Sequence, residues 1–569
     1  MVRNSRSTTK ILYWFLTIWT AINILQAVFT GLHADEAYYW LYSKYLDWGY
    51  FDHPPMVALY ILAGEWLGHS SFGLRLLTVI SSTVGVYVLW LIVKPRYNNI
   101  QLYILLITSI LLFHVYGFIT APDSPLLLFG ILFLYVYQRY ESEDKAKWAV
   151  LLSLVIAGLL YSKYHGVLIL FFTVLSNLSL LRRPSFWGIV FLSILLFAPH
   201  MYWQYQNGFP SLYYHLFERS AKPYRFEYTS DYVLGQLLVA GPLVGWFLYS
   251  IPLKLKKRDR FIRALKFNLF GILFFFFLST FKGRVEPHWT LLAFPPLLII
   301  SYIYLAELKA FPVWLRTLAF ANVGAIVLVR CAFMFPIPGL KDVSIISSFL
   351  SSEAWATQVR EKAGDKNVII QGGFQEASLY NFYNNTTKAF AYDTRYYRKT
   401  QFDIWPLEDS IRNKPAYYVR YVSHGTGALE DTLKTAKGIF FGTNVEGVRT
   451  YQKVIISTSQ MTDSWKAGGL RSLSIKIYNP YAETISFSNK DEIWKSYLEC
   501  GFIQKGKILQ FNPVISKFNS IVIKPRESVT IPVIIRAPSN SGQYNLVFSI
   551  RTDPFPGSRN SSMIPVNIN

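Results

Sequence analysis

Two short acidic motifs near the amino terminus carry the clearest chemical signal in this chain of 569 residues. Asp35 and Glu36 directly follow a long apolar run, and Asp52-His53 precedes a pair of prolines. A carboxylate held at the end of an apolar segment is a candidate catalytic group. The prolines hold Asp52 and His53 at a stiff point where the next helix starts. Each acid also has a structural alternative: Asp35 as a helix N-cap and Asp52 as a hydrogen-bond acceptor in a turn.

Basic side chains stand beside or between further apolar runs. Lys163 separates two apolar halves, and Arg75 lies near the start of another apolar run. An intramembrane cation is costly unless it pairs with an anion, so a functional role is the default expectation, and snorkelling to lipid headgroups is the alternative. Several cations around one cleft suit the phosphate of a lipid. The candidate phosphate-binding residues are Lys163, Arg284, Lys282, Arg75, His53 and Arg219.

Three further residues are candidates for supporting roles: Asp123 in Ala-Pro-Asp-Ser-Pro, and Glu286 and His288 in Glu-Pro-His-Trp. Asp123 could also serve as a helix cap. Asp52 beside His53 would suit a divalent metal ion, but two residues do not define a metal site, so the sequence leaves a metal at Asp52 open. The sequence has no glycine-rich phosphate loop, Gly-x-Ser-x-Gly elbow or His-Glu-x-x-His pair, and so gives no sign of nucleotide hydrolysis, serine esterase or zinc protease chemistry.

The segments that must position these residues are apolar. Hydrophobic residues make up 52% of the chain and charged residues 16%, whereas soluble proteins have about 25% charged residues. We expect about eleven membrane-spanning helices, because a helix needs about 20 apolar residues to cross a bilayer. They are predicted at residues 11–30, 72–93, 101–119, 124–138, 148–161, 166–181, 186–202, 232–253, 267–281, 290–308 and 313–335.

The distribution of charge predicts the topology. The net charge of +22 comes largely from loops beside apolar runs, such as Lys94-Pro-Arg and Leu255-Lys-Lys-Arg. This placement indicates cytoplasmic loops and contact with anionic lipids rather than nucleic-acid binding. With a cytoplasmic amino terminus, the candidate residues all fall on the outer face, and the carboxyl-terminal part also lies outside.

The chain beyond the last apolar run resembles soluble protein. We predict a transmembrane domain at 1–340, an α/β domain at 341–465 and a β-sandwich at 466–569. In the second domain, a strand at Asn367-Val-Ile-Ile-Gln is followed by a helix from Gln375 to Tyr383. In the third, the period-two pattern of Leu473-Ser-Ile-Lys-Ile-Tyr is typical of a sandwich strand.

The motifs together resemble a known family. An Asp-Glu pair after the first span, the run Phe51-Asp-His-Pro-Pro and a later Pro-Asp are similar to the polytopic glycosyltransferases of the GT-C fold. Within that fold, Glu286-Pro-His-Trp and Gly373-Phe-Gln-Glu-Ala-Ser-Leu-Tyr resemble the group of protein mannosyltransferases and lipid A aminoarabinose transferases (ArnT-like). The resemblance covers roughly residues 10–410. In the aminoarabinose transferases an acid and a lysine precede Pro-Pro. This chain has Asp52-His53 there, which points to a relative with a different donor.

The resemblance implies a sugar donor linked to polyprenyl (undecaprenyl) phosphate. It implies that Asp35, with Glu36 beside it, activates the acceptor, and that Lys163 and Arg284 lead the contacts with the departing phosphate. A single displacement would invert the anomeric carbon. The acceptor is left open among lipid, glycan and protein, and the expected location is the bacterial inner membrane with the carboxyl-terminal domains in the periplasm.

A transporter and a membrane-anchored receptor are the alternatives to an enzyme. A transporter or flippase of a lipid-linked anion would also use a cationic cleft, but it would show inverted halves and charges near mid-membrane. A receptor anchored in the membrane would not need eleven spans. The sequence therefore favours the enzyme.

Overall fold

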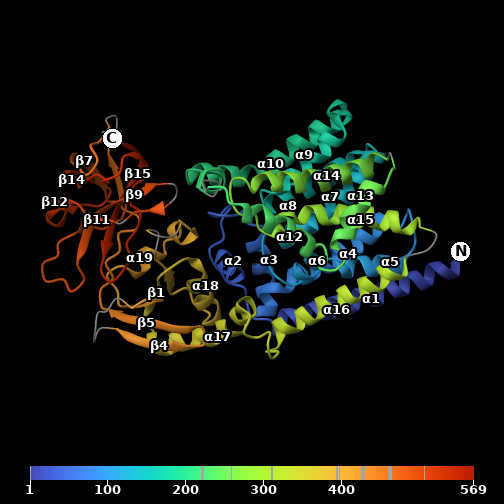
Figure 1. Cartoon of the computed structure of the whole chain (residues 1–569), viewed down its shortest axis with the longest axis horizontal. Helices are drawn as coiled ribbons and strands as arrows, with labels where there is room; N and C mark the ends of the chain where they lie inside the picture. Colours follow the sequence, from blue (N-terminus) through green and yellow to red (C-terminus); the bar gives the residue numbers. More distant parts are fainter. Residues whose placement is uncertain are drawn as a thin grey trace. The chain divides into compact units, whose positions relative to one another are not determined.

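The structure is a computed structural model of the whole chain. It describes residues 2–218, 223–257, 259–308, 312–392, 395, 398–423, 430–458, 464–504, 507–509 and 511–569. These residues form two compact units, Met1–Leu350 and Ser351–Asn569 (Figure 1). The helix α17 (Ser344–Ala363) belongs to both units, since the boundary falls within it.

The first unit is helical. Its α-helices are α1 (Val2–Phe29), α2 (Ala34–Lys44), α3 (Met56–Glu65), α4 (Ser71–Val93), α5 (Ile100–Ser109), α6 (Leu111–Val115), α7 (Asp123–Ser142), α8 (Ala146–Ser162), α9 (Gly166–Ser176), α10 (Pro184–Gln206), α11 (Pro210–Tyr213), α12 (Phe226–Val239), α13 (Gly245–Lys254), α14 (Arg260–Ser279), α15 (Phe294–Ala306) and α16 (Val313–Met334). Short 3₁₀ helices occupy Leu178–Arg182 and Pro287–Ala293, and a π-helical turn occupies Tyr214–Glu218.

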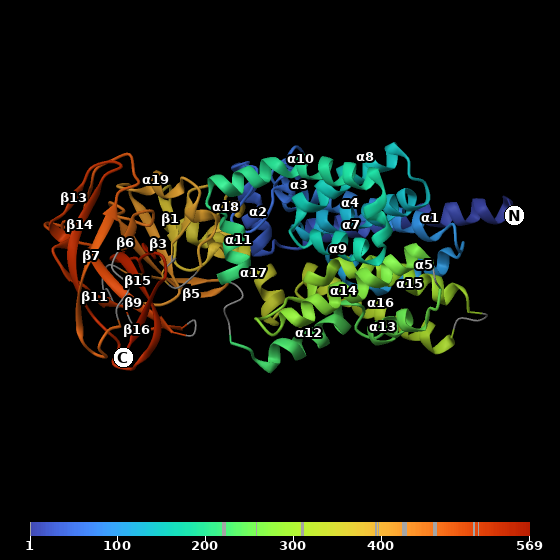
Figure 2. The ribbon, with the colours of Figure 1, turned by 90° about the horizontal axis from the view of Figure 1, so that it is seen from above.

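Six segments of the described chain are helical, long and apolar enough to cross a membrane. They are Ser7–Phe29, Ser71–Val93, Pro184–Gln206, Arg260–Ser279, Pro287–Ala306 and Val313–Met334, and shorter apolar helices lie between them. α8 packs against both α7 and α10 (Figure 2). α15 is buried continuously from Phe294 to Ile303, as expected for a helix that is apolar on every side.

Two predicted spans are broken in the structure. The span at 101–119 divides into α5 and α6, and the span at 232–253 divides into α12 and α13. The second break contains Gly241, whose φ of 128° favours glycine, and a Cβ there would lie 2.6 Å from the carbonyl oxygen of Ser109. The hydropathy pattern did not show these breaks, because they depend on how two distant segments approach each other.

Asn322 of α16 forms hydrogen bonds with a backbone group at each of the two breaks. Its side chain donates to the carbonyl of Ser109 (2.8 Å) and accepts from the N–H of Leu243 (3.0 Å), and it is fully buried. Backbone groups freed by a helix break within an apolar bundle need such a partner.

We expect Asn322→Leu to lower the free energy of unfolding of the first, helical unit (the membrane unit) by about 2–6 kcal/mol. The substitution leaves two buried backbone groups unsatisfied, at about 1–3 kcal/mol each. The loss can be measured as a lower midpoint of thermal unfolding in detergent. The matched control is Asn207→Leu, because Asn207 is exposed and caps only its own helix. Equal midpoints for the two variants would contradict the bridging role of Asn322.

The second unit contains an α/β layer followed by a sandwich. The first sheet has the order β2-β1-β3-β5-β4, with β1 parallel to β2 and β3 and with β5 antiparallel to β3 and β4. Its strands are β1 (Asn367–Ile370), β2 (Ala389–Ala391), β3 (Ala416–Arg420), β4 (Asp431–Thr435) and β5 (Gly438–Val445), and its helices include α18 (Phe374–Tyr383) and α19 (Leu407–Ile411). The predicted strand after residue 366 and the helix that follows it are therefore confirmed as β1 and α18.

The remaining strands form the sandwich that the period-two pattern predicted. They are β6 (Ile455–Thr458), β7 (Leu470–Tyr478), β8 (Ile485–Ser486), β9 (Ser496–Gln504), β10 (Lys507–Ile508), β11 (Asn512–Pro513), β12 (Ile515–Ser516), β13 (Val522–Ile523), β14 (Ser528–Arg536), β15 (Gly542–Thr552) and β16 (Ile564–Ile568). Among the described residues, one sheet has the order β10-β9-β15-β16 and the facing sheet the order β12-β14-β7-β6. The division of this unit at residue 466 stays a prediction.

Buried charges join the α/β layer to the sandwich. The Tyr481 hydroxyl lies 3.0 Å from both carboxyl oxygens of Glu408 in α19 and shares its one proton between them. Arg412 stacks on the Tyr481 ring at 3.7 Å. Arg395 pairs with Glu499 of β9 at 2.5 Å. These buried side chains hold the two layers together, because separating the layers would leave each buried charge without its partner.

We expect this junction to be less stable at pH 8 than at pH 5. Burial raises the pKa of both Glu408 and Asp403 above their ordinary values. Stability contributed by such acids is complete below the unfolded pKa of about 4 and is lost as the pH rises through the raised folded pKa. Hydrogen exchange of β7 and α19, corrected for intrinsic rates, should show weaker protection at pH 8. Glu408→Gln should reduce the difference, and equal protection at both pH values in the parent chain would contradict the prediction.

Candidate active site

Asp35 lies in the first turn of α2, but it is not the N-cap of that helix. His33 is the N-cap: its Nδ1 accepts from the N–H of Asp35 at 3.2 Å. Glu36 closes the capping box, since its Oε2 accepts from the N–H of His33 at 3.0 Å. The structural alternative for Asp35 is therefore wrong, and its carboxylate, 42% exposed, is not used as a cap.

Glu36 is fully buried and binds Arg75 of α4 through both oxygens. The Nε of Arg75 lies 2.8 Å from Oε1 and its Nη2 lies 2.6 Å from Oε2. The N–H of Thr120 donates to Oε1 at 2.9 Å. With four donors around it, the Glu36 carboxylate is well placed to fix α2 and poorly placed to accept a proton from a substrate. The geometry therefore argues against the predicted catalytic role of Glu36.

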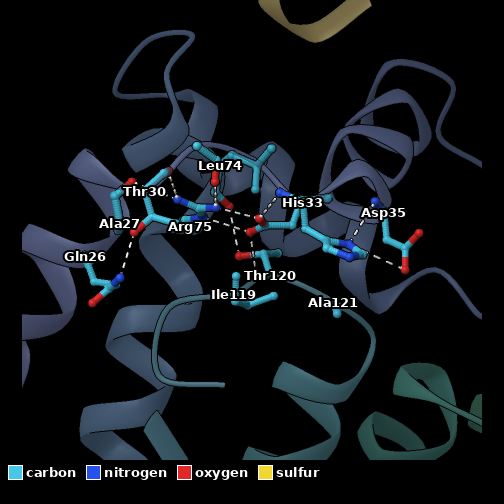
Figure 3. Close-up of polar contacts among 12 residues, drawn as sticks. Gln26, Ala27, Thr30, His33, Asp35, Leu74, Arg75, Ile119, Thr120 and Ala121 are labelled. Carbon is cyan, nitrogen blue, oxygen red and sulfur yellow. Dashed lines mark hydrogen bonds and ion pairs between the residues drawn. The ribbon is translucent and has the colours of Figure 1, made fainter. Parts of the chain in front are cut away.

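Arg75 is also used entirely within the protein. Its Nη1 donates to the carbonyls of Ala27 (3.1 Å) and Thr30 (2.6 Å), and its Nη2 donates to that of Gly31 (2.8 Å) (Figure 3). Together with Glu36, these acceptors occupy all five N–H groups of the guanidinium. Figure 3 shows the Asp35 side chain pointing away from Arg75. In this structure no N–H group of Arg75 is left for a ligand, and its phosphate contact stays a prediction.

Lys163 has the anionic partner that its position in an apolar region requires. Its Nζ lies 2.9 and 2.8 Å from the two carboxylate oxygens of Asp123, and both side chains are buried. Asp123 is the first residue of α7, and Lys163 directly follows α8. The structure therefore brings together a predicted supporting acid and a predicted phosphate-binding cation. A role of Lys163 in binding phosphate stays a prediction.

The Asp52-His53 loop is held rigidly before α3, as the two prolines indicated. Asp52 is buried, its carbonyl accepts from Nε2 of His215 at 3.1 Å, and the N–H of Tyr50 donates to the carbonyl of His53 at 3.0 Å. The His53 ring meets the Tyr39 ring edge-on at 5.7 Å. This contact places the loop against the same helix that carries Asp35.

Three carboxylates from separate segments act on one buried phenol. Burial raises the pKa of Tyr39 well above its ordinary value, and the charges of Asp35, Asp52 and Asp123 raise it further. Asp35 and Tyr39 are four residues apart on α2 and so lie on one face. Tyr39 was not predicted as a site residue, although this spacing could have shown it. Burial and the three negative charges together favour the protonated form of the Tyr39 hydroxyl.

The loop from Lys282 to His288 presents the most accessible of the predicted cations in the described chain. Arg284 is 62% exposed and pairs with Glu286 at 3.3 Å, and Lys282 is also exposed. His288 lies with its ring 6.3 Å from that of Tyr116, on which the charges of Asp123 and Asp35 also act. The helix α12 fixes this loop, because Gln236 donates to the carbonyl of Pro287 at 3.1 Å.

The described part of the chain gives no position for the predicted Arg219 and no set of ligands for a metal ion at Asp52. Arg219 lies outside the described residues. Among the described residues, no group of three or more histidine, cysteine or acidic side chains is arranged to hold a metal ion. Asp52 as a metal ligand stays a prediction.

Comparisons with known proteins identify the fold of the chain. Residues 52–203 match the family model described as dolichyl-phosphate-mannose-protein mannosyltransferase. ArnT from Cupriavidus metallidurans in the apo state aligns with a TM-score of 0.56 and 14% identity, over 77% of this chain and 98% of ArnT. The chain has the GT-C fold. The same ArnT bound to undecaprenyl phosphate aligns with a TM-score of 0.55 and 15% identity, over 76% of this chain and 98% of ArnT. No curated protein matches the sequence.

The GT-C fold confirms the architecture predicted from the motifs, in which a polytopic helical part precedes strand-rich domains. The family match begins at Asp52 and includes Asp123 and Lys163. Asp35 lies outside the matched segment, so its role rests on its own geometry.

Proposed function

We propose that this chain is an integral-membrane glycosyltransferase that uses a sugar donor linked to polyprenyl phosphate, on the outer face of the membrane. One observation carries the proposal: within a GT-C fold, Asp35 stands half-exposed on a firmly capped helix that contacts the Asp52-His53 loop through Tyr39. The donor class is supported by the ArnT complex with undecaprenyl phosphate and by the family match.

Asp35 is the general base of the proposed reaction. It takes the proton of an acceptor hydroxyl group as the oxygen attacks the anomeric carbon. The new bond forms between that oxygen and the anomeric carbon, and the bond from the same carbon to the phosphate oxygen breaks. The phosphate leaves with the electron pair, so the displacement inverts the anomeric carbon.

Cations of the outer loops stabilise the departing phosphate. Arg284 and Lys282 are exposed and can turn toward a ligand, and Arg284 gives up only a partly exposed partner, Glu286. Positive charge near a leaving phosphate stabilises the transition state. We assign Lys163 to the same phosphate. Its pair with Asp123 compensates its charge and so allows a lysine inside the apolar bundle.

The proposal is tested by mass spectrometry of the lipid that co-purifies with the protein. We expect bare polyprenyl phosphate with the parent chain and a glycosylated polyprenyl phosphate with Asp35→Asn. The matched control is Asp231→Asn, an exposed acid on α12, which should resemble the parent chain. If no variant carries a polyprenyl phosphate, and added undecaprenyl phosphate does not bind, the glycosyltransferase proposal fails and transport of a lipid-linked anion should be tested.

The acceptor is a lipid, a glycan or a protein, and we propose that the α/β layer and the sandwich help to choose it. In support, 77% of this chain covers 98% of ArnT, so the chain contains a substantial segment that ArnT lacks. The test compares the acceptor range of the full chain with that of a chain ending at residue 465. Donor hydrolysis serves as the control for an intact membrane unit. An unaltered acceptor range and rate would refute the role of the sandwich.

A further inference from the structure

The N-cap of α2 is an unusual residue for that position. Caps are normally serine, threonine, aspartate or asparagine, whereas here the acceptor is Nδ1 of His33. The same Nδ1 lies 3.2 Å from the N–H of Asp35 and 3.7 Å from its Oδ2. To accept the N–H, Nδ1 must be unprotonated, which puts the ring proton on Nε2. One atom therefore fixes the backbone of Asp35 and stands beside its carboxylate.

The orientation of the imidazole is supported by the helix α17. The ring of Phe349 lies 5.6 Å from the ring of His33, and Phe349 is buried. Phe333 of α16 meets Phe349 edge-on at 5.1 Å. Aromatic contacts of this kind favour a fixed ring geometry. A continuous series of rings thus connects the last membrane helix to the cap of the helix turn that carries Asp35.

We propose that His33 is a positioning residue for Asp35, and that Phe349 acts on Asp35 through the His33 ring. This inference rests on the proposed function, in which Asp35 is the general base. Phe349 holds the imidazole so that Nδ1 faces the first turn of α2. Nδ1 accepts from the backbone N–H of Asp35 and so fixes the backbone position from which the Asp35 carboxylate projects. A misdirected base lowers the rate of the chemical step without weakening donor binding.

The experiment follows a single turnover of the donor in reconstituted full-length protein. The glycosylated lipid retained by Asp35→Asn is extracted and supplied to each variant in vesicles of phosphatidylethanolamine and phosphatidylglycerol. Water is the acceptor in this assay: its oxygen bonds to the anomeric carbon, and the rate at which bare polyprenyl phosphate is released gives the chemical step. The donor concentration for half-saturation gives binding. We expect His33→Ala to slow the step about 10- to 100-fold with little change in half-saturation. His33→Asn should recover most of that loss, because asparagine is itself an effective cap.

Phe349→Ala provides the second arm. In the parent chain it should slow the step several-fold, whereas in the His33→Asn background it should have no effect, because asparagine offers no ring for Phe349 to hold. Phe320→Ala, an exposed phenylalanine of α16, is the matched control. Equal effects of Phe349→Ala in both backgrounds, or a His33→Ala chain with the parent rate, would overturn the inference. A parent chain that neither retains nor turns over the donor would instead overturn the proposed function.

Discussion

Asp35→Asn is expected to lower the rate of sugar transfer by about 10²- to 10⁴-fold, the range typical of a lost general base. Asparagine has the shape of aspartate but cannot accept the acceptor proton. The helix turn should be unaffected, because the cap is His33 and the capping box is closed by Glu36. The half-saturating donor concentration should therefore stay close to that of the parent chain.

The measurement is the transfer rate at saturating donor over a range of pH. Asp35→Glu should retain part of the activity, since it keeps a carboxylate at a shifted position. The control for charge alone is again Asp231→Asn. A rate for Asp35→Asn within a few-fold of the parent would show that another group takes the proton, and Asp52 would be the next candidate because it acts on the same Tyr39.

The sequence could predict roles for charged residues that stand in or beside apolar segments, because an unpaired charge there costs free energy. Lys163 was predicted to need an anion because it interrupts an apolar region, and its partner is Asp123. Asp35 was predicted from its place at the end of the first span, but the sequence could not decide between cap and base. That decision depends on His33, whose capping geometry is visible only once α2 exists.

Roles that depend on distant partners could not be predicted. Arg75 had the signature of a phosphate-binding cation, since a sequence shows the charge of a residue and not its acceptors. In the folded chain its five N–H groups meet carbonyls from the end of α1 and the carboxylate of Glu36. The break at Gly241 was hidden for the same reason, because Ser109 and Asn322 come from other parts of the chain.

The second large effect concerns the buried pair of Glu36 and Arg75. Removing one partner leaves the other charge uncompensated inside the protein, which typically costs about 3–5 kcal/mol. Arg75→Met should therefore lower the free energy of unfolding of the membrane unit by an amount in this range. Glu36→Gln should also destabilise the unit, because the buried guanidinium loses its counter-charge. Its amide oxygen can still accept from Nε of Arg75 and from Thr120, but its nitrogen cannot accept from Nη2 as Oε2 does.

The double variant separates pairing from packing. In Glu36→Gln with Arg75→Met no unpaired charge remains, so the double variant should be more stable than Arg75→Met alone. Unfolding in detergent measures the stability of all three variants. A double variant whose loss equals the sum of the single losses would show that the two side chains act independently.

Activity gives the other half of the test. If the pair only holds α2, then variants that remain folded should bind the donor normally and transfer the sugar slowly, because Asp35 is carried by the turn that Glu36 anchors. If Arg75 instead binds the donor phosphate, Arg75→Met should raise the half-saturating donor concentration, and Glu36→Gln should leave it nearly unchanged. The five bonds that Arg75 makes within the protein favour the first result, since each would have to break before the guanidinium could reach a phosphate.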